Sequence, residues 1–170
     1  MTYSIEQASG EHLRFIPAIE LAAASMFPEE DLPRSLRYRV TDNVVLRQAC
    51  EARKLWVALT GDGQAVGYAM TDTMDGHAHL HEMDVHPSHA RQGLGTRLLA
   101  AAMEKARLDE FSHISLVTFR HLPWNAPFYE KRGFSTLPLQ KQGPQLRALL
   151  AEESDAGLNG LNRIAMWTEL

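Results

Sequence analysis

The clearest chemical signal in this sequence is a pair of glycines between an expected strand and an expected helix. The pair lies in the segment Arg91-Gln92-Gly93-Leu94-Gly95-Thr96, which follows the strand-like residues 80–85 and Pro87. The first N–H groups of a helix lack partners within the helix and carry partial positive charge, so they bind phosphate readily. Glycines let a pyrophosphate come close to the main chain. The pattern predicts a phosphate-binding turn, with Arg91 and Arg97 adding charge at its rim.

Glycine pairs also occur at helix N-termini that bind no ligand. The flanking residues must therefore show which of the known phosphate-binding motifs the pair could belong to. A dinucleotide-binding fingerprint requires a third glycine where Leu98 stands. A Walker loop requires Gly-Lys followed by Ser or Thr, and the sequence contains no such tripeptide. Both nucleotide-binding classes are therefore excluded.

Two segments together resemble a known family. Val85-His86-Pro87, a five-residue spacer and Gly93-Leu94-Gly95 resemble the acetyl-CoA signature of the GNAT superfamily of N-acetyltransferases. Forty residues after Val85, the stretch from Asn125 to Phe134 resembles the second signature of that family, Asn-x-x-x-Tyr-x-x-x-Gly-Phe. The family usually has Arg or Gln three residues before the first glycine, and here Ala90 departs from that pattern. Either motif alone is weak evidence for the family. The two motifs together, in this order and at this spacing, are specific for it.

The resemblance implies that acetyl-CoA is the co-substrate. The strand at Met83-Asp84-Val85 would offer backbone groups to the pantetheine arm and an N–H to the acetyl oxygen. Asn125 would contact the same arm and also cap the short helix that follows it. The expected cofactor-binding residues are Met83, Asp84, Val85, Arg91, Gln92, Gly93, Leu94, Gly95, Thr96, Asn125 and Phe128.

The resemblance also suggests which residues carry the chemistry. Acetyl transfer requires that the amine lose a proton, since alkyl ammonium groups have pKa values of about 10. Tyr129 stands where the family places the tyrosine that protonates the departing sulfur. Glu82 stands on the strand where related enzymes often use a carboxylate as the base. Strand alternation puts Glu82 and Asp84 on one face, so either could act unless a bulge intervenes.

The implied reaction is acetylation of a primary amine, on a small metabolite or amino-acid-like compound, by direct attack in a ternary complex. Two alternatives stay open: acetylation of a protein N-terminus or lysine, and an acyl-CoA-binding module without catalysis. Acceptor contacts are expected first around Arg120-His121-Leu122-Pro123-Trp124. A homodimer is possible by analogy with the family.

Metal chemistry is not expected. His77, His79 and His81 alternate on one strand, but a closed metal site needs convergent ligands from several elements. The single Cys50 cannot supply a multi-cysteine zinc site.

Composition indicates one soluble domain over residues 1–170, with 45% hydrophobic residues to build a core. The formal charge of −4 comes with scattered Lys and Arg, so nucleic acid is not an expected partner. There is no secretory signal and no run near the roughly 18 to 20 apolar residues that span a bilayer, so we expect a cytoplasmic protein without membrane contact.

Hydrophobic periodicity places the elements that must position these residues. Strands are expected at residues 3–7, 55–59, 65–73, 77–86, 113–119, 134–139 and 163–168. Helices are expected at 11–25, 36–53, about 94–108, 125–132 and 144–153. This alternation indicates an α/β (α+β) layer fold. The resemblance further implies a mixed, mostly antiparallel sheet of about seven strands flanked by helices, with a parallel splayed pair holding acetyl-CoA.

Overall fold

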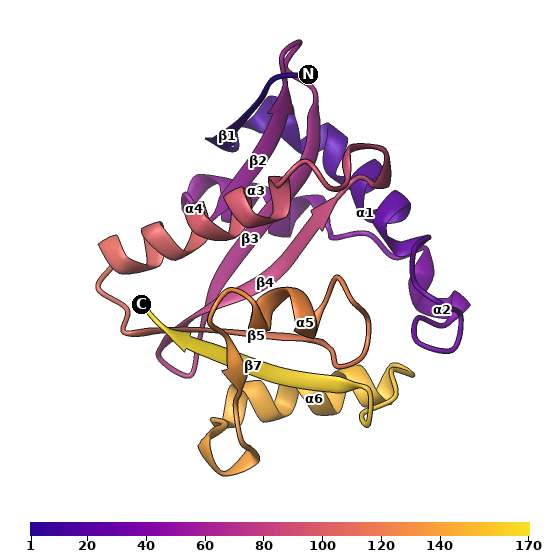
Figure 1. Cartoon of the computed structure of the whole chain (residues 1–170), viewed down its shortest axis with the longest axis vertical. Coiled ribbons are helices and arrows are strands. Elements are labelled where there is room, and N and C mark those ends of the chain that lie inside the picture. Colours follow the sequence, from indigo (N-terminus) through magenta and orange to yellow (C-terminus); the bar gives the residue numbers. More distant parts are fainter. The chain divides into compact units, whose positions relative to one another are not determined.

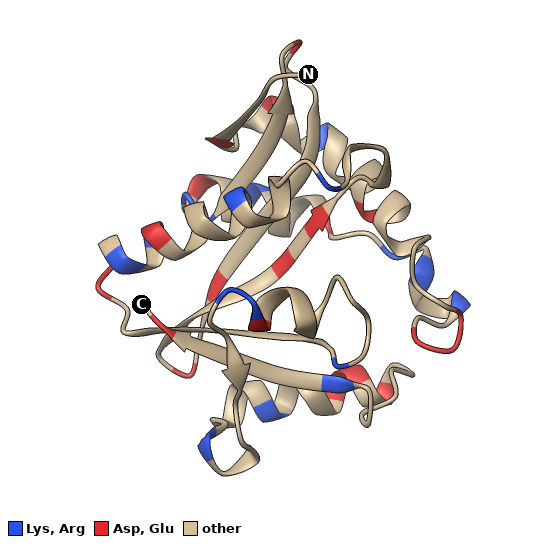
Figure 2. Cartoon of the chain, in the orientation of Figure 1, with Lys and Arg blue, Asp and Glu red and all other residues tan.

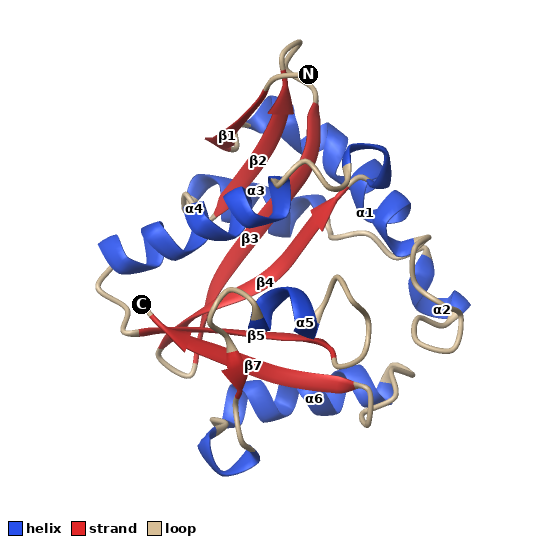
Figure 3. Ribbon diagram, in the orientation of Figure 1, coloured by secondary structure: helices blue, strands red, loops and turns tan.

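The structure, a computed structural model, describes residues 1–170 as a mixed sheet with helices (Figures 1 and 3). The strands are β1 (Tyr3–Gln7), β2 (Leu55–Thr60), β3 (Ala65–Met74), β4 (His77–Val85), β5 (His113–Phe119), β6 (Ser135–Thr136) and β7 (Arg163–Glu169). The α-helices are α1 (Ile16–Ala24), α2 (Arg34–Arg37), α3 (Asn43–Glu51), α4 (Leu94–Leu108), α5 (Ala126–Glu130) and α6 (Pro144–Asp155). Short 3-10 helices are η1 (Gly10–Phe15), η2 (Pro87–His89) and η3 (Leu139–Lys141).

The seven strands pair in the order β1-β2-β3-β4-β5-β7-β6. Strands β4 and β5 run parallel, whereas β1 with β2, β2 with β3, β5 with β7 and β6 with β7 are antiparallel. The predicted fold class, a mixed and mostly antiparallel seven-stranded sheet flanked by helices, is therefore confirmed. None of the helices combines the length and apolar character needed to cross a membrane.

The chain divides into two compact units, which are described separately. The first comprises residues 1–72 and 81–105, and the second comprises residues 73–80 and 106–170. Strands β3 and β4 each contribute residues to both units.

The first unit has a helix on each face of its strands. One face buries Tyr68 and Val57 against α1 and α3 in a cluster that includes Ile16, Ile19 and Leu46. Gly67, the neighbour of Tyr68, faces the other way, because side chains alternate along a strand. A Cβ at Gly67 would come within 3.3 Å of the side chain of Leu98 on α4 and 3.1 Å of the Asp84 carbonyl oxygen. A side chain at this position would crowd both β4 and α4, so its neighbours would have to move by a few tenths of an ångström.

In the second unit, β5 is the central strand. It pairs with β7 from His113↔Glu169 to Phe119↔Arg163. Its parallel pairing with β4 covers Ala78↔Ile114 to Leu80↔Leu116, although β4 itself continues to Val85. Helix α6 covers the unit's core through Leu146, Leu149 and Leu150, which pack with residues of β5, β6–η3 and β7.

The single helix predicted over residues 36–53 is wrong, because the structure has two helices, α2 and α3, separated by residues 38–42. Asp42 caps α3 by accepting a hydrogen bond from the Val44 N–H at 2.7 Å. The Thr41 N–H donates to the Glu20 carboxylate at 2.9 Å. This backbone group therefore makes a tertiary hydrogen bond and no helical one. The helix predicted from residue 11 likewise begins as η1, and α1 starts at Ile16.

The strand predicted at residues 134–139 is also wrong in extent, since β6 is limited to Ser135–Thr136. The Leu137 N–H still donates to the Ala165 carbonyl oxygen at 2.8 Å. The chain then leaves the sheet, with Pro138 as the N-cap of η3.

Candidate active site

The predicted phosphate turn lies at the exposed N-terminus of α4, in the first unit. Arg91 and Gly93 have φ angles of 59° and 73°, so both adopt the left-handed conformation. Arg91, Gln92 and Gly93 are exposed, and a Cβ on Gly93 would meet no atom within 4 Å. The Arg97 N–H donates to the Gly93 carbonyl oxygen at 3.1 Å. The N–H groups of Leu94 and Gly95 lie ahead of this first helical bond, at the position where helices bind anions.

Two side chains tie this turn to β1. The Tyr3 hydroxyl and His89 Nδ1 are 2.9 Å apart, and the two rings meet edge to face with centroids 5.8 Å apart. The Arg97 guanidinium donates to the Tyr3 carbonyl oxygen at 3.1 Å. Arg97, predicted as a rim charge, therefore also anchors the turn.

One acidic side chain, that of Glu20, is buried on the face of the first unit that α1 covers. The Tyr68 hydroxyl donates to Glu20 Oε1 at 2.6 Å, and the Thr41 N–H and hydroxyl donate to the two oxygens of the same carboxylate. The His86 N–H donates to the Val66 carbonyl oxygen at 2.8 Å, which joins the residue after β4 to β3. Figure 2 shows acidic positions along β4.

The two candidate bases on β4 differ in their surroundings. Glu82 is exposed and Asp84 is half-buried. Burial raises the pKa of Asp84 well above its ordinary value, and the negative charges of Glu82 and Glu20 raise it further. Burial also raises the pKa of Tyr68, with Glu82, Asp84 and Glu20 adding to the effect. The sequence did not indicate this rise in the pKa of Asp84.

Sequence reasoning missed Glu20, Thr41 and Tyr68 as members of this cluster. The available signal was Glu20, a lone acid within the otherwise apolar helix Ile16–Ala24. Such a residue, 8% exposed, needs hydrogen-bond partners that a helical pattern alone does not identify.

In the second unit, Asn125 is buried and bonds to β5. Its Oδ1 accepts hydrogen bonds from the Thr118 hydroxyl at 2.9 Å and the Phe119 N–H at 3.2 Å. Asn125 is the N-cap residue of α5, as predicted, but its side chain makes no capping hydrogen bond. Its backbone carbonyl oxygen instead accepts from the Phe128 N–H at 2.8 Å. The amide thus anchors α5 to β5.

Tyr129 is only 8% exposed and lies among aromatic rings of the same motif. Its ring meets those of Phe128 and Phe134 with centroids 5.1 Å and 5.6 Å apart. The Arg132 guanidinium lies 3.6 Å from the centre of the Phe128 ring and donates to the Phe128 carbonyl oxygen at 2.7 Å. Gly133 has a φ of 92°, which ends the short helix and returns the chain to β6.

The predicted residues are thus distributed over both units. Glu82, Met83, Asp84, Val85 and the turn at residues 91–96 belong to the first unit, and Asn125, Phe128 and Tyr129 belong to the second. Within the first unit, the charges of Glu82, Asp84 and Glu20 raise the pKa of Tyr68. Within the second, α5 carries Phe128 and Tyr129, and Asn125 directly precedes the helix.

The histidines of β4 have separate environments. His79 is 1% exposed, and its Nδ1 lies 2.8 Å from the Ser115 hydroxyl. His77 is exposed and lies edge to face with His113 at 5.5 Å. No three His, Cys, Asp or Glu side chains are grouped to hold a metal ion.

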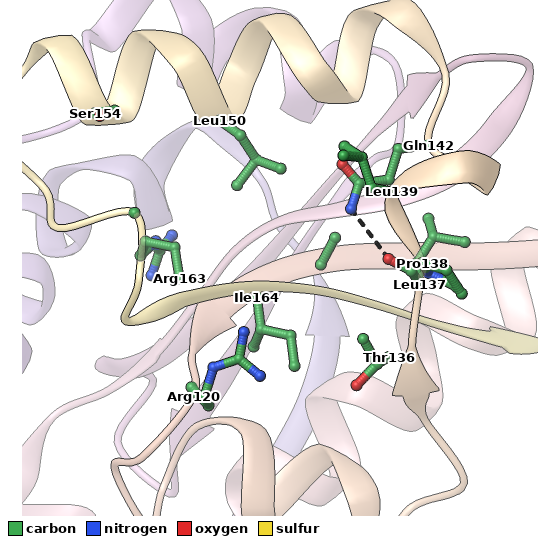
Figure 4. Close-up of a pocket in the computed structure, with 12 residues that line it drawn as sticks. Arg120, Thr136, Leu137, Pro138, Leu139, Gln142, Leu150, Ser154, Arg163 and Ile164 are labelled. Carbon is green, nitrogen blue, oxygen red and sulfur yellow. Dashed lines mark hydrogen bonds between the residues drawn. The ribbon is translucent and has the colours of Figure 1, made fainter.

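A hollow of about 280 Å³ in the second unit contains none of the motif residues (Figure 4). It lies between α6, the segment from β6 to η3, and the start of β7. Gln142 Nε2 donates to the Leu137 carbonyl oxygen at 3.0 Å along its wall. Arg163, also in the wall, pairs with both Glu153 carboxylate oxygens at 2.9 Å. Arg120, from the segment where acceptor contacts were expected, also lines the hollow. Because the motif residues lie elsewhere, we assign the chemistry to the motifs.

A family model described as the acetyltransferase (GNAT) family matches residues 17–134 of the chain. The protein belongs to the GNAT acetyltransferase family. The matched segment contains both predicted motifs and ends at Phe134, the last residue of the second. The predicted family is therefore confirmed.

Solved structures share the fold of this GNAT acetyltransferase. The PaiA N-acetyltransferase from Thermoplasma acidophilum, in complex with coenzyme A, has a TM-score of 0.70 and 16% identity over 100% of both chains. N-acetylglutamate synthase from Neisseria gonorrhoeae, complexed with coenzyme A and N-acetyl-glutamate, has a TM-score of 0.69 and 20% identity. The chain is covered completely in that match but spans 35% of the synthase. The NatC complex bound to Gag peptide and CoA has a TM-score of 0.67 and 11% identity, over 100% of this chain and 99% of the other.

Proposed function

We propose that this GNAT acetyltransferase transfers the acetyl group of acetyl-CoA to a primary amine by direct attack in a ternary complex. The observation that carries the proposal is the exposed turn at α4, where left-handed Arg91 and Gly93 precede the first N–H groups of the helix. An open cradle of backbone donors fits a pyrophosphate, and Arg91 supplies a positive charge beside it. The coenzyme A in related structures supports the same ligand.

Glu82, on the strand before the first motif, and Tyr129, in the second motif, carry out different proton transfers. Glu82 takes a proton from the acceptor ammonium, which frees the nitrogen lone pair. The nitrogen attacks the thioester carbon, the C–N bond forms, the C–S bond breaks, and Tyr129 gives its proton to the departing sulfur. The nitrogen then loses its second proton, which restores Tyr129, and Glu82 releases its proton to solvent. An ammonium and acetyl-CoA become an N-acetyl amine, coenzyme A thiol and one proton.

The proposed acceptor is a small metabolite or amino-acid-like amine. The related structures hold N-acetyl-glutamate in one case and a peptide in another, so peptide N-termini and lysine side chains belong in the test. Comparing amines that have an α-carboxylate with amines that lack one distinguishes amino-acid-like acceptors from other small amines.

Calorimetric titration with acetyl-CoA, followed by detection of coenzyme A thiol with an amine panel, tests the proposal. We expect saturable binding of acetyl-CoA and amine-dependent thiol release, with the acetylated product found by mass spectrometry. Binding without release for any amine or peptide would support a non-catalytic acyl-CoA-binding module. Absence of binding would overturn the proposal.

A further inference from the structure

One residue of β1 contacts both ends of the turn that precedes α4. The Tyr3 hydroxyl lies 2.9 Å from Nδ1 of His89, the last residue of η2. The Tyr3 carbonyl oxygen accepts a hydrogen bond from the Arg97 guanidinium at 3.1 Å. Residues 90–96 lie between these two contacts, and all of these residues belong to the first unit. Tyr3 therefore fixes the chain on either side of the turn.

The turn itself has a backbone conformation that needs such support. Arg91 has a φ of 59°, in the left-handed region that is unfavourable for a residue with a Cβ. Arg91 and Gln92 are exposed, so burial of their side chains does not hold this conformation. An unfavourable backbone conformation persists where the surrounding structure determines it. Contacts on both sides of the turn meet this requirement, together with Leu94, which is 1% exposed and begins α4.

The two segments that the hydroxyl joins each have a fixed backbone. Strand β1 pairs with β2 along its full length, beginning with Tyr3↔Thr60. The backbone of His89 is fixed in η2, because its N–H donates to the His86 carbonyl oxygen at 2.8 Å. The rings of Tyr3 and His89 also meet edge to face, with centroids 5.8 Å apart. The hydroxyl–imidazole contact therefore connects the entry to the turn with the edge of the sheet.

We propose that Tyr3 is a positioning residue of the cofactor site, which acts through His89 and Arg97 to keep the turn in the conformation that presents the first N–H groups of α4 to the pyrophosphate of acetyl-CoA. This inference rests on the proposed function. Tyr3 touches neither acetyl-CoA nor the acceptor amine in this scheme. Strand β1, at the edge of the sheet and without a residue of either motif, thereby becomes part of the cofactor site.

Tyr3→Phe tests the hydroxyl by itself. This variant keeps the ring, the carbonyl oxygen that binds Arg97 and the pairing of β1, and it loses one oxygen atom. We expect the dissociation constant of acetyl-CoA, measured by calorimetry, to rise about fivefold, because a smaller fraction of molecules has a competent turn. The KM for acetyl-CoA should rise with it, while kcat at saturating acetyl-CoA stays within about twofold of the wild type.

Ser4→Ala is the matched control. Ser4 is the next residue of the same strand, and its hydroxyl donates to the Glu6 carboxylate at 2.8 Å, so this bond lies within β1. We expect Ser4→Ala to bind acetyl-CoA as the wild type does. Urea denaturation of both variants separates positioning from stability. If Tyr3→Phe lost unfolding free energy but bound acetyl-CoA as tightly as the control, the role of Tyr3 would be structural only and the proposal would be wrong.

A double-mutant cycle shows whether the hydroxyl acts through His89. His89→Ala removes the partner of the hydroxyl, so adding Tyr3→Phe to it should change the affinity for acetyl-CoA by less than about twofold. Losses of affinity that add in the double variant would contradict the proposal. His89→Ala also leaves the packing of β1 untouched, which provides a second route to the result should Tyr3→Phe fold poorly.

NMR of the protein without ligand tests the same contact independently of the proposed function. Nitrogen-15 labelling reports the ring nitrogens of His89 and the amides of Gly93 and Gly95. We expect these signals to shift or broaden in Tyr3→Phe and to stay in place in Ser4→Ala. Amide signals that are identical in Tyr3→Phe and the wild type would overturn the proposal. A wild type that does not bind acetyl-CoA would refute the proposed function, and this measurement would still decide whether Tyr3 holds the turn.

Discussion

The two motif segments obtain their geometry in opposite ways. The turn before α4 is shaped by the backbone: Arg91 and Gly93 are left-handed, the surface is exposed, and the first helical N–H groups form the cradle. The segment at α5 is shaped by side chains: the buried amide of Asn125 binds β5, and Tyr129 lies between two aromatic rings. A substitution in the turn should therefore act by making the left-handed φ angles unfavourable. A substitution in the α5 segment should act by removing side-chain atoms that make contacts.

The largest expected effect comes from the α5 segment. Tyr129→Phe removes one oxygen and keeps the ring packing, so kcat should fall about 10²-fold or more if the hydroxyl protonates the sulfur. Binding of acetyl-CoA should stay within about twofold, since the cradle lies in the other segment. Steady-state kinetics and calorimetry measure the two effects, with Tyr38→Phe as the control because Tyr38 is 68% exposed. Retained turnover in Tyr129→Phe would show that Tyr129 is not the proton donor to the sulfur.

A smaller effect is expected from the amide that anchors α5. Asn125→Ala leaves the Thr118 hydroxyl and Phe119 N–H without their acceptor inside the second unit, which costs about 1–3 kcal/mol of unfolding free energy. Urea denaturation measures this loss, and Asn43→Ala on the exposed first turn of α3 is the matched control. If both variants lost the same free energy, the amide would not be the anchor.

The smallest effect is expected at the turn. Gly93→Ala forces a side chain into a φ of 73°, at a cost of about 1–2 kcal/mol, so the turn populates other conformations. The apparent affinity for acetyl-CoA should fall about tenfold, in proportion to the competent fraction. Gly10→Ala is the control, because Gly10 has open space around it and no positive φ. Calorimetry that found equal affinities for the two variants would show that the backbone conformation does not shape the cradle.

Elements with strong local patterns were predicted well. β1, β4, α4 and β5 lie within a residue or so of the predicted ranges, because strand and helix periods are properties of the backbone. Residues 38–42 were assigned to a helix in error, since the Thr41 N–H is used by Glu20, a residue distant in sequence. The extent of β6 was overestimated although Pro138 was visible.

The sequence by itself determined the family and the place of the two motifs, because glycine spacing and strand and helix periods are local. Only the tertiary structure decided what each side chain does. Glu20 and Tyr68 are 48 residues apart in the chain and share a hydrogen bond, and Asn125 bonds to β5 instead of its own helix. Strand alternation makes Asp84 and Glu82 equivalent, and only the tertiary structure distinguishes them. The pKa of a carboxyl group depends on its burial and on the charges that packing brings near it, and both raise the pKa of Asp84.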